Sequence, residues 1–277
     1  MNLDRGPMSI GLLGPLLMHL NQTPVPTSAP KQRQVVALLA LNVGRVVTGP
    51  TLIKELWGDS PPRSHVTTLQ TYIMQLRKAL AAADSGNPDA RQMLSTSHCG
   101  YLLEEAACQT DVEVFGRHSR AGRTAAEAGD HRLASEEFGR ALQLWRGPAL
   151  ADVRMGHVLE IEVASLEEGR LGALERRIEA DLTLGRHADL LGELTLVTAM
   201  NPDNENFCAF LMTALYCSGH VGRSLKAFHR LRHVLNLELG VEPCPRLQRL
   251  QAAILVGDPA LEARSMPWSL PAARRSG

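Results

Sequence analysis

The chain has 277 residues, with 29 basic and 29 acidic side chains and 44% hydrophobic residues. This apolar fraction is normal for a folded protein and excludes a wholly disordered chain. No apolar run approaches the roughly 18 residues that cross a bilayer, so we expect no membrane span. The five cysteines form no CxxC pair, which argues against a zinc finger or a disulfide framework and favours a cytoplasmic protein.

The balanced total charge hides an uneven distribution along the chain. Residues 1–103 hold nine Lys or Arg against five Asp or Glu, a net charge of +4, so the remainder carries −4. A basic first third favours a nucleic-acid-binding module joined to a second part of different character.

The first predicted elements are two short strands, Ile10–Leu13 and Leu16–Leu20, with a turn at Asn21 and Gln22 and a return near Val25. Three prolines then close the segment, because proline removes a donor from the ladder of a sheet.

Three helices and a hairpin are predicted next. The helices are expected at 30–43, 52–57 and Pro62 to about Ala83, and the hairpin at 93–103. The first and third open at prolines, and Gly44 and Gly58 end the first two. This order is that of a winged helix-turn-helix.

The third helix carries the predicted DNA-reading face. Leu69, Ile73, Leu76 and Leu80 recur at spacings of 4, 3 and 4 and form a buried seam. At about 100° per residue, the opposite face holds the candidates for base contacts, which are Thr67, Thr68, Thr71, Met74 and Gln75. Such a helix fits the major groove, where Gln can pair with adenine and Thr methyls can contact thymine. The alternative is an ordinary solvated face of an amphipathic helix.

The candidates for phosphate contacts are Lys31 and Arg33 at the start of the first helix, and Arg77 and Lys78 along the third. A helix N-terminus adds free backbone N–H groups, which also favour phosphate. In the hairpin, Ser97 and His98 stand where a wing can lie against the minor groove. The alternative for the start of the first helix is a solvated helix cap, and the alternative for the hairpin is a plain surface turn.

The second part of the chain predicts helices throughout. Gly185 and Gly219 are 34 residues apart, the period of tetratricopeptide repeats, and Gly129 opens an earlier unit. Similar residues follow each glycine at offsets of 5, 9 and 12. They are Ala134, Phe138 and Ala141, then Leu190, Leu194 and Val197, and last Ser224, Phe228 and Leu231. We predict a short solenoid of helix pairs and, at 258–277, a disordered tail.

The sequence offers no constellation for catalysis or for a metal. His229 and His233 stand four residues apart on a predicted helix, but no further ligand is in sight. No GxSxG motif marks a nucleophile. We expect no enzyme activity, no cofactor and no metal.

Long blocks of the chain resemble one known family. They are GLLGPL, PKQRQVVALLAL, LIKELWGDSPPRSHVTTLQTYIMQLRKAL, GYLL, LQLWRGPALADV, LEEGRLGALERRIEADLTLGRHADLLGEL and ALYCSGHVGRSLKAFHRLRHVLNLELGVEP. In this order, over residues 8–257, they are similar to the Streptomyces antibiotic regulatory protein family.

The resemblance implies a mainly α fold. An OmpR-type winged-helix DNA-binding domain at 8–104 would precede a tetratricopeptide-like bacterial transcriptional activation domain at 111–257. It also implies an activator that binds direct repeats upstream of promoters in an antibiotic biosynthetic gene cluster. By position it carries over Thr67, Thr71, Met74 and Gln75 as base-facing residues, and Gly58, Asp59 and Ser60 as a polymerase-facing loop.

The partners implied by the resemblance are double-stranded DNA, RNA polymerase holoenzyme with its principal sigma factor, and a neighbouring protomer on the DNA. Such a protein would be cytoplasmic and associated with the nucleoid. The family often carries arginine at the position of Gln75 and in the wing, whereas Ser95–Cys99 contains none. Fewer cations weaken phosphate binding. The alternative function is therefore a helical-repeat adaptor whose winged helix does not read DNA.

Overall fold

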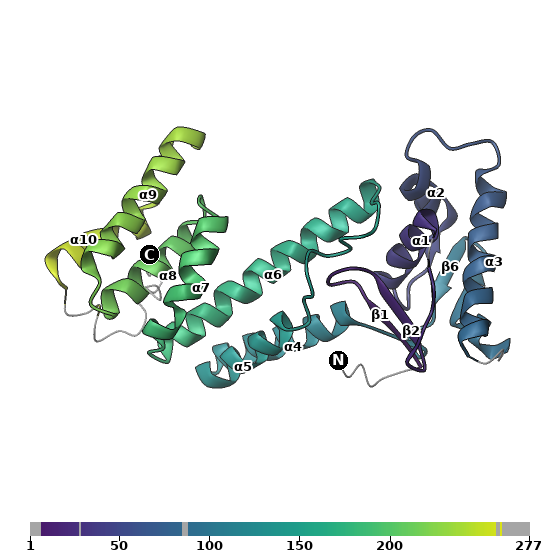
Figure 1. Cartoon of the computed structure of the whole chain (residues 1–277), viewed down its shortest axis with the longest axis horizontal. Helices are drawn as coiled ribbons and strands as arrows, with labels where there is room; N and C mark the ends of the chain where they lie inside the picture. Colours follow the sequence, from purple (N-terminus) through teal and green to yellow (C-terminus); the bar gives the residue numbers. More distant parts are fainter. Residues whose placement is uncertain (1–6, 28, 85–87, 259–260, 262–277) are drawn as a thin grey trace, which may run out of the picture. The chain divides into compact units, whose positions relative to one another are not determined.

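The computed structural model describes residues 7–27, 29–84, 88–258 and 261 (Figure 1). The chain divides into two compact units. Unit 1 comprises Met1–Arg120 with Arg140–Leu171, and unit 2 comprises Ala121–Gly139 with Gly172–Gly277. Apart from Asp258 and Leu261, the tail predicted at 258–277 lies outside the described residues. None of the helices described is both long and apolar enough to span a bilayer.

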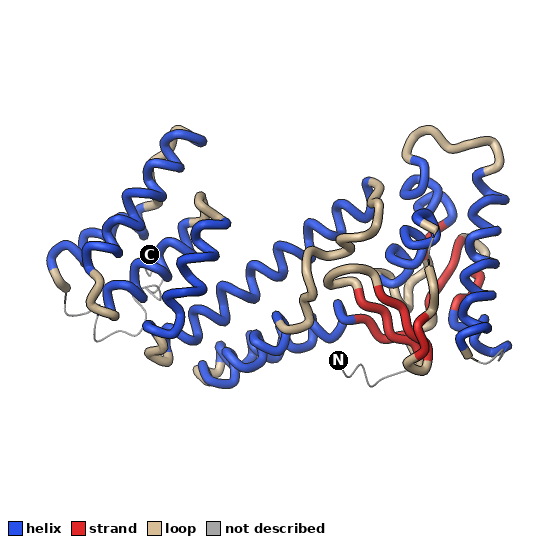
Figure 2. Tube along the Cα trace, in the orientation of Figure 1, coloured by secondary structure: helices blue, strands red, loops and turns tan. Residues whose placement is uncertain are grey.

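Unit 1 contains a winged helix made of two small sheets and three helices (Figure 2). Its elements up to residue 110 are β1 (Met8–Gly11), β2 (Leu17–Leu20), β3 (Thr23–Pro24), α1 (Pro30–Ala40), β4 (Val47–Thr48), α2 (Gly49–Trp57), α3 (His65–Ala83), the 3-10 helix η1 (Pro88–Met93), β5 (Leu94–Ser97), β6 (Gly100–Leu103) and β7 (Cys108–Thr110). One sheet has the order β3-β2-β1-β7 and the other the order β4-β6-β5. The predicted winged-helix order is confirmed.

The turn predicted after the second strand is also confirmed. Asn21 and Gln22 both have positive φ, at 48° and 67°. Two successive left-handed residues make the tight connection that suits the twist of a two-stranded hairpin. The pairing of β2 with β3 follows from this turn, with Leu20 opposite Thr23.

Several predicted boundaries are wrong. The third helix begins at His65 rather than Pro62, because the residues before it form a turn in which the His65 N–H donates to the Pro62 carbonyl over 3.0 Å. The first helix ends at Ala40, before the expected stop at Gly44. No strand was predicted at β7, which pairs in parallel with β1 across 100 positions of the chain, with Met8 opposite Cys108.

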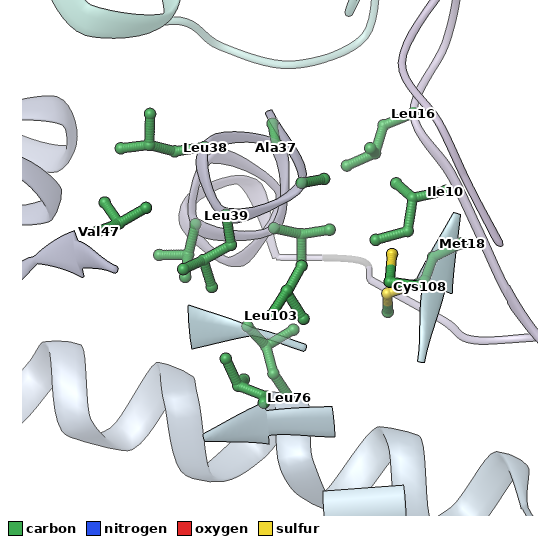
Figure 3. Close-up of a cluster of buried hydrophobic side chains, with 14 of the residues drawn as sticks. Ile10, Leu16, Met18, Ala37, Leu38, Leu39, Val47, Leu76, Leu103 and Cys108 are labelled. Atoms are coloured by element: carbon green, nitrogen blue, oxygen red, sulfur yellow. The ribbon is translucent and has the colours of Figure 1, made fainter. Parts of the chain in front are cut away.

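The hydrophobic core of unit 1 surrounds α1. Leu38 and Leu39 of this helix are 1% exposed. Figure 3 shows the helix with Ile10 and Met18 of the first sheet on one side and Leu103 of the second sheet on another. Residues 34–40 of α1 are buried in succession, so the helix is enclosed on several sides.

The same core is completed by residues that follow the winged helix in sequence. Leu150, Val153 and Leu159 are buried in the cluster that contains α1. The backbone N–H of Leu150 donates to the Leu12 carbonyl over 3.0 Å. Unit 1 is thus larger than a winged helix alone. The predicted domain boundary between 104 and 111 stays a prediction.

Two buried carboxylates fasten these added residues to the winged helix. Asp111 accepts the backbone N–H groups of Leu12 and Leu13 over 2.7 and 3.0 Å, and Arg146 lies 3.3 Å from it. Burial raises the pKa of Asp111 despite these three contacts, which lower it.

Glu55 is the second such carboxylate. It is 3% exposed and accepts the N–H groups of Gly156, Val158 and Leu159 over 2.6 to 3.0 Å. These are N–H groups at a helix start, which have no partner within the helix.

The second part of the chain is helical, as predicted. Its helices are α4 (Asp111–Glu127), α5 (His131–Leu142), α6 (His157–Thr183), α7 (His187–Met200), α8 (Glu205–Cys217), α9 (Val221–Leu239) and α10 (Pro245–Val256). Gly129, Gly185 and Gly219 each have φ near +79°, which only glycine adopts freely, so each turns the chain between two helices. The mainly α fold, with a winged helix before a helical-repeat region, is confirmed.

Within unit 2, most of the predicted seam of the repeats is buried. Phe138, Leu194 and Ser224 are each 0% exposed. The Ser224 hydroxyl donates to the Met212 carbonyl over 2.9 Å, which explains why a polar residue occupies a core position.

Candidate nucleic-acid interface

The predicted seam of α3 faces the core and its opposite face is open. Leu69, Ile73, Leu76 and Leu80 are between 1% and 3% exposed. On the opposite face Thr67, Met74 and Gln75 are exposed, and Thr68 and Thr71 are half-buried. The structure therefore brings the five candidate base-reading residues together on one helix.

Two of the three threonines on this face have hydroxyls bonded to the helix backbone. Thr68 and Thr71 donate their hydroxyl hydrogens to the carbonyls of Ser64 and Thr67, each over 2.9 Å. A hydroxyl bonded to the preceding turn leaves its methyl directed outward. With the 61% exposed Met74 beside them, these methyls form an apolar strip that matches thymine methyl groups.

Gln75 has a neighbour that the sequence did not suggest. The Gln32 side chain, in the first turn of α1, donates to the Gln75 side-chain carbonyl. The two amides still offer donors and acceptors to a ligand, because each amide has two of both. No sequence signal links residues 43 positions apart, so only the fold reveals this pair.

Both predicted phosphate contacts at the start of α1 have partners inside unit 1. The Arg33 guanidinium lies 2.6 Å from Asp152 and also donates to the carbonyls of Leu16 and Thr27. Lys31 donates to the Leu56 carbonyl and lies 4.8 Å from the ring centre of Trp57.

Burial and the charge of Arg154 lower the pKa of Lys31. The cations at the start of α1 therefore have partners within the fold, which sequence reasoning could not foresee because Asp152 lies 119 residues away.

Arg77 and Lys78 lie on α3 in different surroundings. Arg77 donates to the Leu94 carbonyl and the Thr96 hydroxyl over 2.8 and 2.7 Å, which ties α3 to β5 of the wing. Lys78 is exposed. Arg63, just before α3, is exposed as well, and the sequence reading overlooked it although a cation before a helix start is a recognisable signal.

The wing is a tight hairpin whose position depends on Gly100. A Cβ there would lie 2.0 Å from the Val47 carbonyl oxygen of β4, so only glycine permits this close approach. Ser97 is half-buried and His98 is exposed, at the turn between β5 and β6. The wing is thus fixed to the sheet while its tip faces solvent.

The loop between α2 and α3 is open to solvent. Gly58, Asp59 and Ser60 are all exposed, and Gly58 turns the chain with φ of 61°. Glu55, three residues earlier, holds the start of α6 through the three N–H groups described above. This loop therefore follows a helix that is anchored at a buried carboxylate.

Two family models match the chain. The model for the C-terminal domain of transcriptional regulatory proteins matches residues 24–103, and the model for the bacterial transcriptional activator domain matches residues 110–255.

Individual relatives are similar over most of the chain. The regulatory protein DnrI of Streptomyces peucetius is 51% identical over 257 residues, covering 92% of this chain and 94% of that protein. The transcriptional regulator RedD of Streptomyces coelicolor is 36% identical and covers 96% of this chain and 75% of its own length.

A solved structure shares the fold. It is that of Mycobacterium tuberculosis EmbR in complex with a low-affinity phosphopeptide. The TM-score is 0.84 at 34% identity, with 93% of this chain and 68% of that chain covered.

Proposed function

The chain belongs to the Streptomyces antibiotic regulatory protein family of DNA-binding transcriptional activators, and we propose that it activates one antibiotic biosynthetic gene cluster by binding direct repeats upstream of its promoters. The observation that carries this proposal is the open face of α3, where the candidate base-reading residues lie together. We expect no catalytic activity.

In this proposal α3 enters the major groove and reads bases through the methyl strip, Met74 and Gln75. Lys78 and Arg63 take the larger share of the phosphate contacts, because Lys31 and Arg33 already have partners in the fold. Ser97 and His98 lie at the minor groove. Arg77 contributes chiefly by holding the wing in register with α3.

Protomers bind successive direct repeats on the DNA, and each contacts its neighbour. The bound protein, associated with the nucleoid, then recruits RNA polymerase holoenzyme with its principal sigma factor to the promoter. The exposed loop of Gly58, Asp59 and Ser60 is one surface for this contact. Weak contacts add up through effective concentration once the partners share one DNA molecule. Off DNA we expect a monomer, which sedimentation of the free protein tests.

The base-reading assignment is tested by replacing Thr71 and Gln75 with Ala. A lost base contact costs about 1–3 kcal/mol, so we expect operator affinity to fall about tenfold or more for the double variant. Gln70→Ala is the matched control, since Gln70 is an exposed amide on the flank of the same helix. Unchanged operator affinity in the double variant, with helical content intact, would contradict the assignment.

One observation favours the adaptor alternative. Three of the four predicted phosphate contacts, Lys31, Arg33 and Arg77, have partners within unit 1, so the DNA-binding face carries few free cations. Chromatin immunoprecipitation with sequencing of a tagged copy in the native host separates the two functions. Strong peaks at promoters of one cluster, sharing direct repeats, support the activator, whereas no peaks in cells that express the protein support the adaptor.

A further inference from the structure

Helix α9, labelled in Figure 1, carries a row of three cations and a histidine on its exposed face. Arg223, Lys226, Arg230 and His233 are spaced by three, four and three residues, and all are exposed. At 100° per residue they lie within about 80° of arc. The buried side of the same helix, at Ser224, Phe228, Leu231 and Leu235, lies opposite. We name Arg223, Lys226, Arg230 and His233 the α9 stripe.

The fold makes no visible use of the α9 stripe. Other arginines of unit 2 face carboxylates: Arg177 and Arg186 contact Asp181, and Arg232 contacts Glu242 over 2.7 Å. Among the residues that the structure describes, none of the stripe cations forms an ion pair. Their charges are therefore available to a partner.

Charge along the helical region is segregated as well. Residues 220–257 hold six Lys or Arg against two Asp or Glu, a net charge of +4. Residues 111–219 hold 11 against 18, a net charge of −7. The last two helices are thus basic within an acidic region, and such a local field attracts an acidic partner.

An ordinary solvated helix face has a different pattern, which α4 provides for comparison. Arg117, Arg120 and Arg123 are also exposed and lie on one face of that helix, but Glu113 and Glu127 stand four residues from its first and last arginine. Opposite charges at this spacing offset each other along the helix. The α9 stripe contains no acidic residue between Arg223 and His233.

The α9 stripe continues into an exposed apolar side chain. Leu237, four residues after His233 on the same face, is 75% exposed. From Arg223 to Leu237 the face spans about 21 Å, roughly four helical turns. Arginine is enriched at protein interfaces, and an exposed large apolar side chain beside polar residues marks an interaction site.

We propose that the α9 stripe with Leu237 binds an acidic polypeptide segment of RNA polymerase holoenzyme that also carries an apolar anchor residue. This inference rests on the proposed function, since it names a surface through which the activator reaches the transcription machinery. A DNA duplex fits less well, because its phosphate surface offers nothing to bury Leu237. Opposite charges speed the encounter, and the apolar anchor slows dissociation.

The test measures binding of purified holoenzyme from the native host to the full-length protein, immobilised without DNA. The variant R223E/K226E/R230E is compared with R117E/R120E/R123E, which makes the same change in charge on α4. We expect the first to weaken holoenzyme binding about tenfold or more and the second to change it little. Leu237→Ser should weaken binding less and with little dependence on salt. Circular dichroism checks that helical content is kept.

The outcomes separate this inference from the proposed function, because operator affinity is measured on the same proteins. Equal holoenzyme binding by both triple variants, or no binding by the wild type, overturns the role of the α9 stripe. A loss of operator affinity confined to R223E/K226E/R230E also overturns it, in favour of a DNA contact. A wild-type protein that binds holoenzyme but no promoter leaves the stripe in place and contradicts the proposed function instead.

Discussion

The contacts that stabilise unit 1 span longer distances along the chain than the contacts that stabilise unit 2. In unit 1, Glu55 bonds residues 101 to 104 positions later, and Asp111 bonds residues 98 and 99 positions earlier. In unit 2, Asp181 contacts Arg177 and Arg186, four and five positions away, and Ser135, 46 positions away.

This difference explains why the core of unit 2 is easier to predict from the sequence than the core of unit 1. It also explains why we expect different kinds of substitution to destabilise each unit. A helical repeat buries its seam against near neighbours in sequence, so periodicity reveals its core. The winged helix of unit 1 depends on charged groups whose partners lie far along the chain. Its weak points are therefore single polar residues, whereas the weak points of unit 2 are packing positions.

The largest effect is expected for Glu55→Ala. The substitution leaves three N–H groups at the start of α6 without their acceptor, which we expect to lower the free energy of unfolding by about 2–4 kcal/mol. Urea unfolding followed by circular dichroism measures the change. Glu160→Ala, at an exposed glutamate on α6, is the control and should cost little.

The reactivity of two buried thiols shows in which unit the stability is lost. Burial raises the pKa of Cys108 in unit 1 and of Cys208 in unit 2 to about 12, so neither thiol reacts unless its surroundings open. Glu55→Ala should speed labelling of Cys108 and leave Cys208 slow. Equal acceleration of both would show that the two units unfold together and would break the comparison.

A smaller loss is expected in unit 2 for Gly122→Ala. The new Cβ would lie 3.0 Å from three ring atoms of Phe138, a fully buried side chain, and the cost of this crowding should be about 1–2 kcal/mol. Gly139→Ala on α5 meets nothing within 4 Å and should stabilise the protein by about 0.5–1 kcal/mol through helix propensity. A stabilising Gly122→Ala would mean that the seam is loosely packed.

What the sequence could predict follows the same division. The repeat glycines and the seam around Phe138 were predictable, because both are local patterns in the chain. The partners of Arg33 and Lys31 could not be predicted, because the sequence does not show whether a cation faces solvent or a carboxylate such as Asp152. The face of α3 was predictable from its period, but its link to Gln32 required the fold.

One missed feature did have a sequence signal. Thr110 and Glu113 form a reciprocal capping box at the start of α4, each side chain bonding the other's backbone N–H over 3.1 Å. A threonine followed three residues later by glutamate marks a helix start. This box places Asp111 at the point where it meets Leu12 and Leu13, so a local rule positions a long-range contact.

A still smaller effect is expected for Ser224→Ala in unit 2. The buried hydroxyl donates to the Met212 carbonyl, and its loss should cost about 1 kcal/mol. Ser218→Ala is the matched control, because the buried Ser218 hydroxyl has no hydrogen-bond partner among the described residues. Thermal and urea unfolding of both variants measure the difference. Equal costs would indicate that the hydroxyl of Ser224 adds nothing beyond its volume.

The smallest effect concerns pH and the ion pair of Arg33 with Asp152. Burial acts to raise the pKa of Asp152, but the Leu16 N–H and the Arg33 guanidinium outweigh it and the pKa is lowered. A carboxyl with a lowered pKa stabilises the fold above the unfolded pKa of about 4, and this contribution is lost as the pH falls through the lower folded value.

Because the Asp152 side chain is 45% exposed, we expect only a few tenths of a kcal/mol. The free energies of unfolding of wild type and Asp152→Asn should therefore differ at pH 6 and converge near pH 3. The difference at pH 6 should also shrink in 1 M salt. A difference that persists at pH 3 would mean that Asp152 acts through its hydrogen bond to Leu16 rather than through its charge.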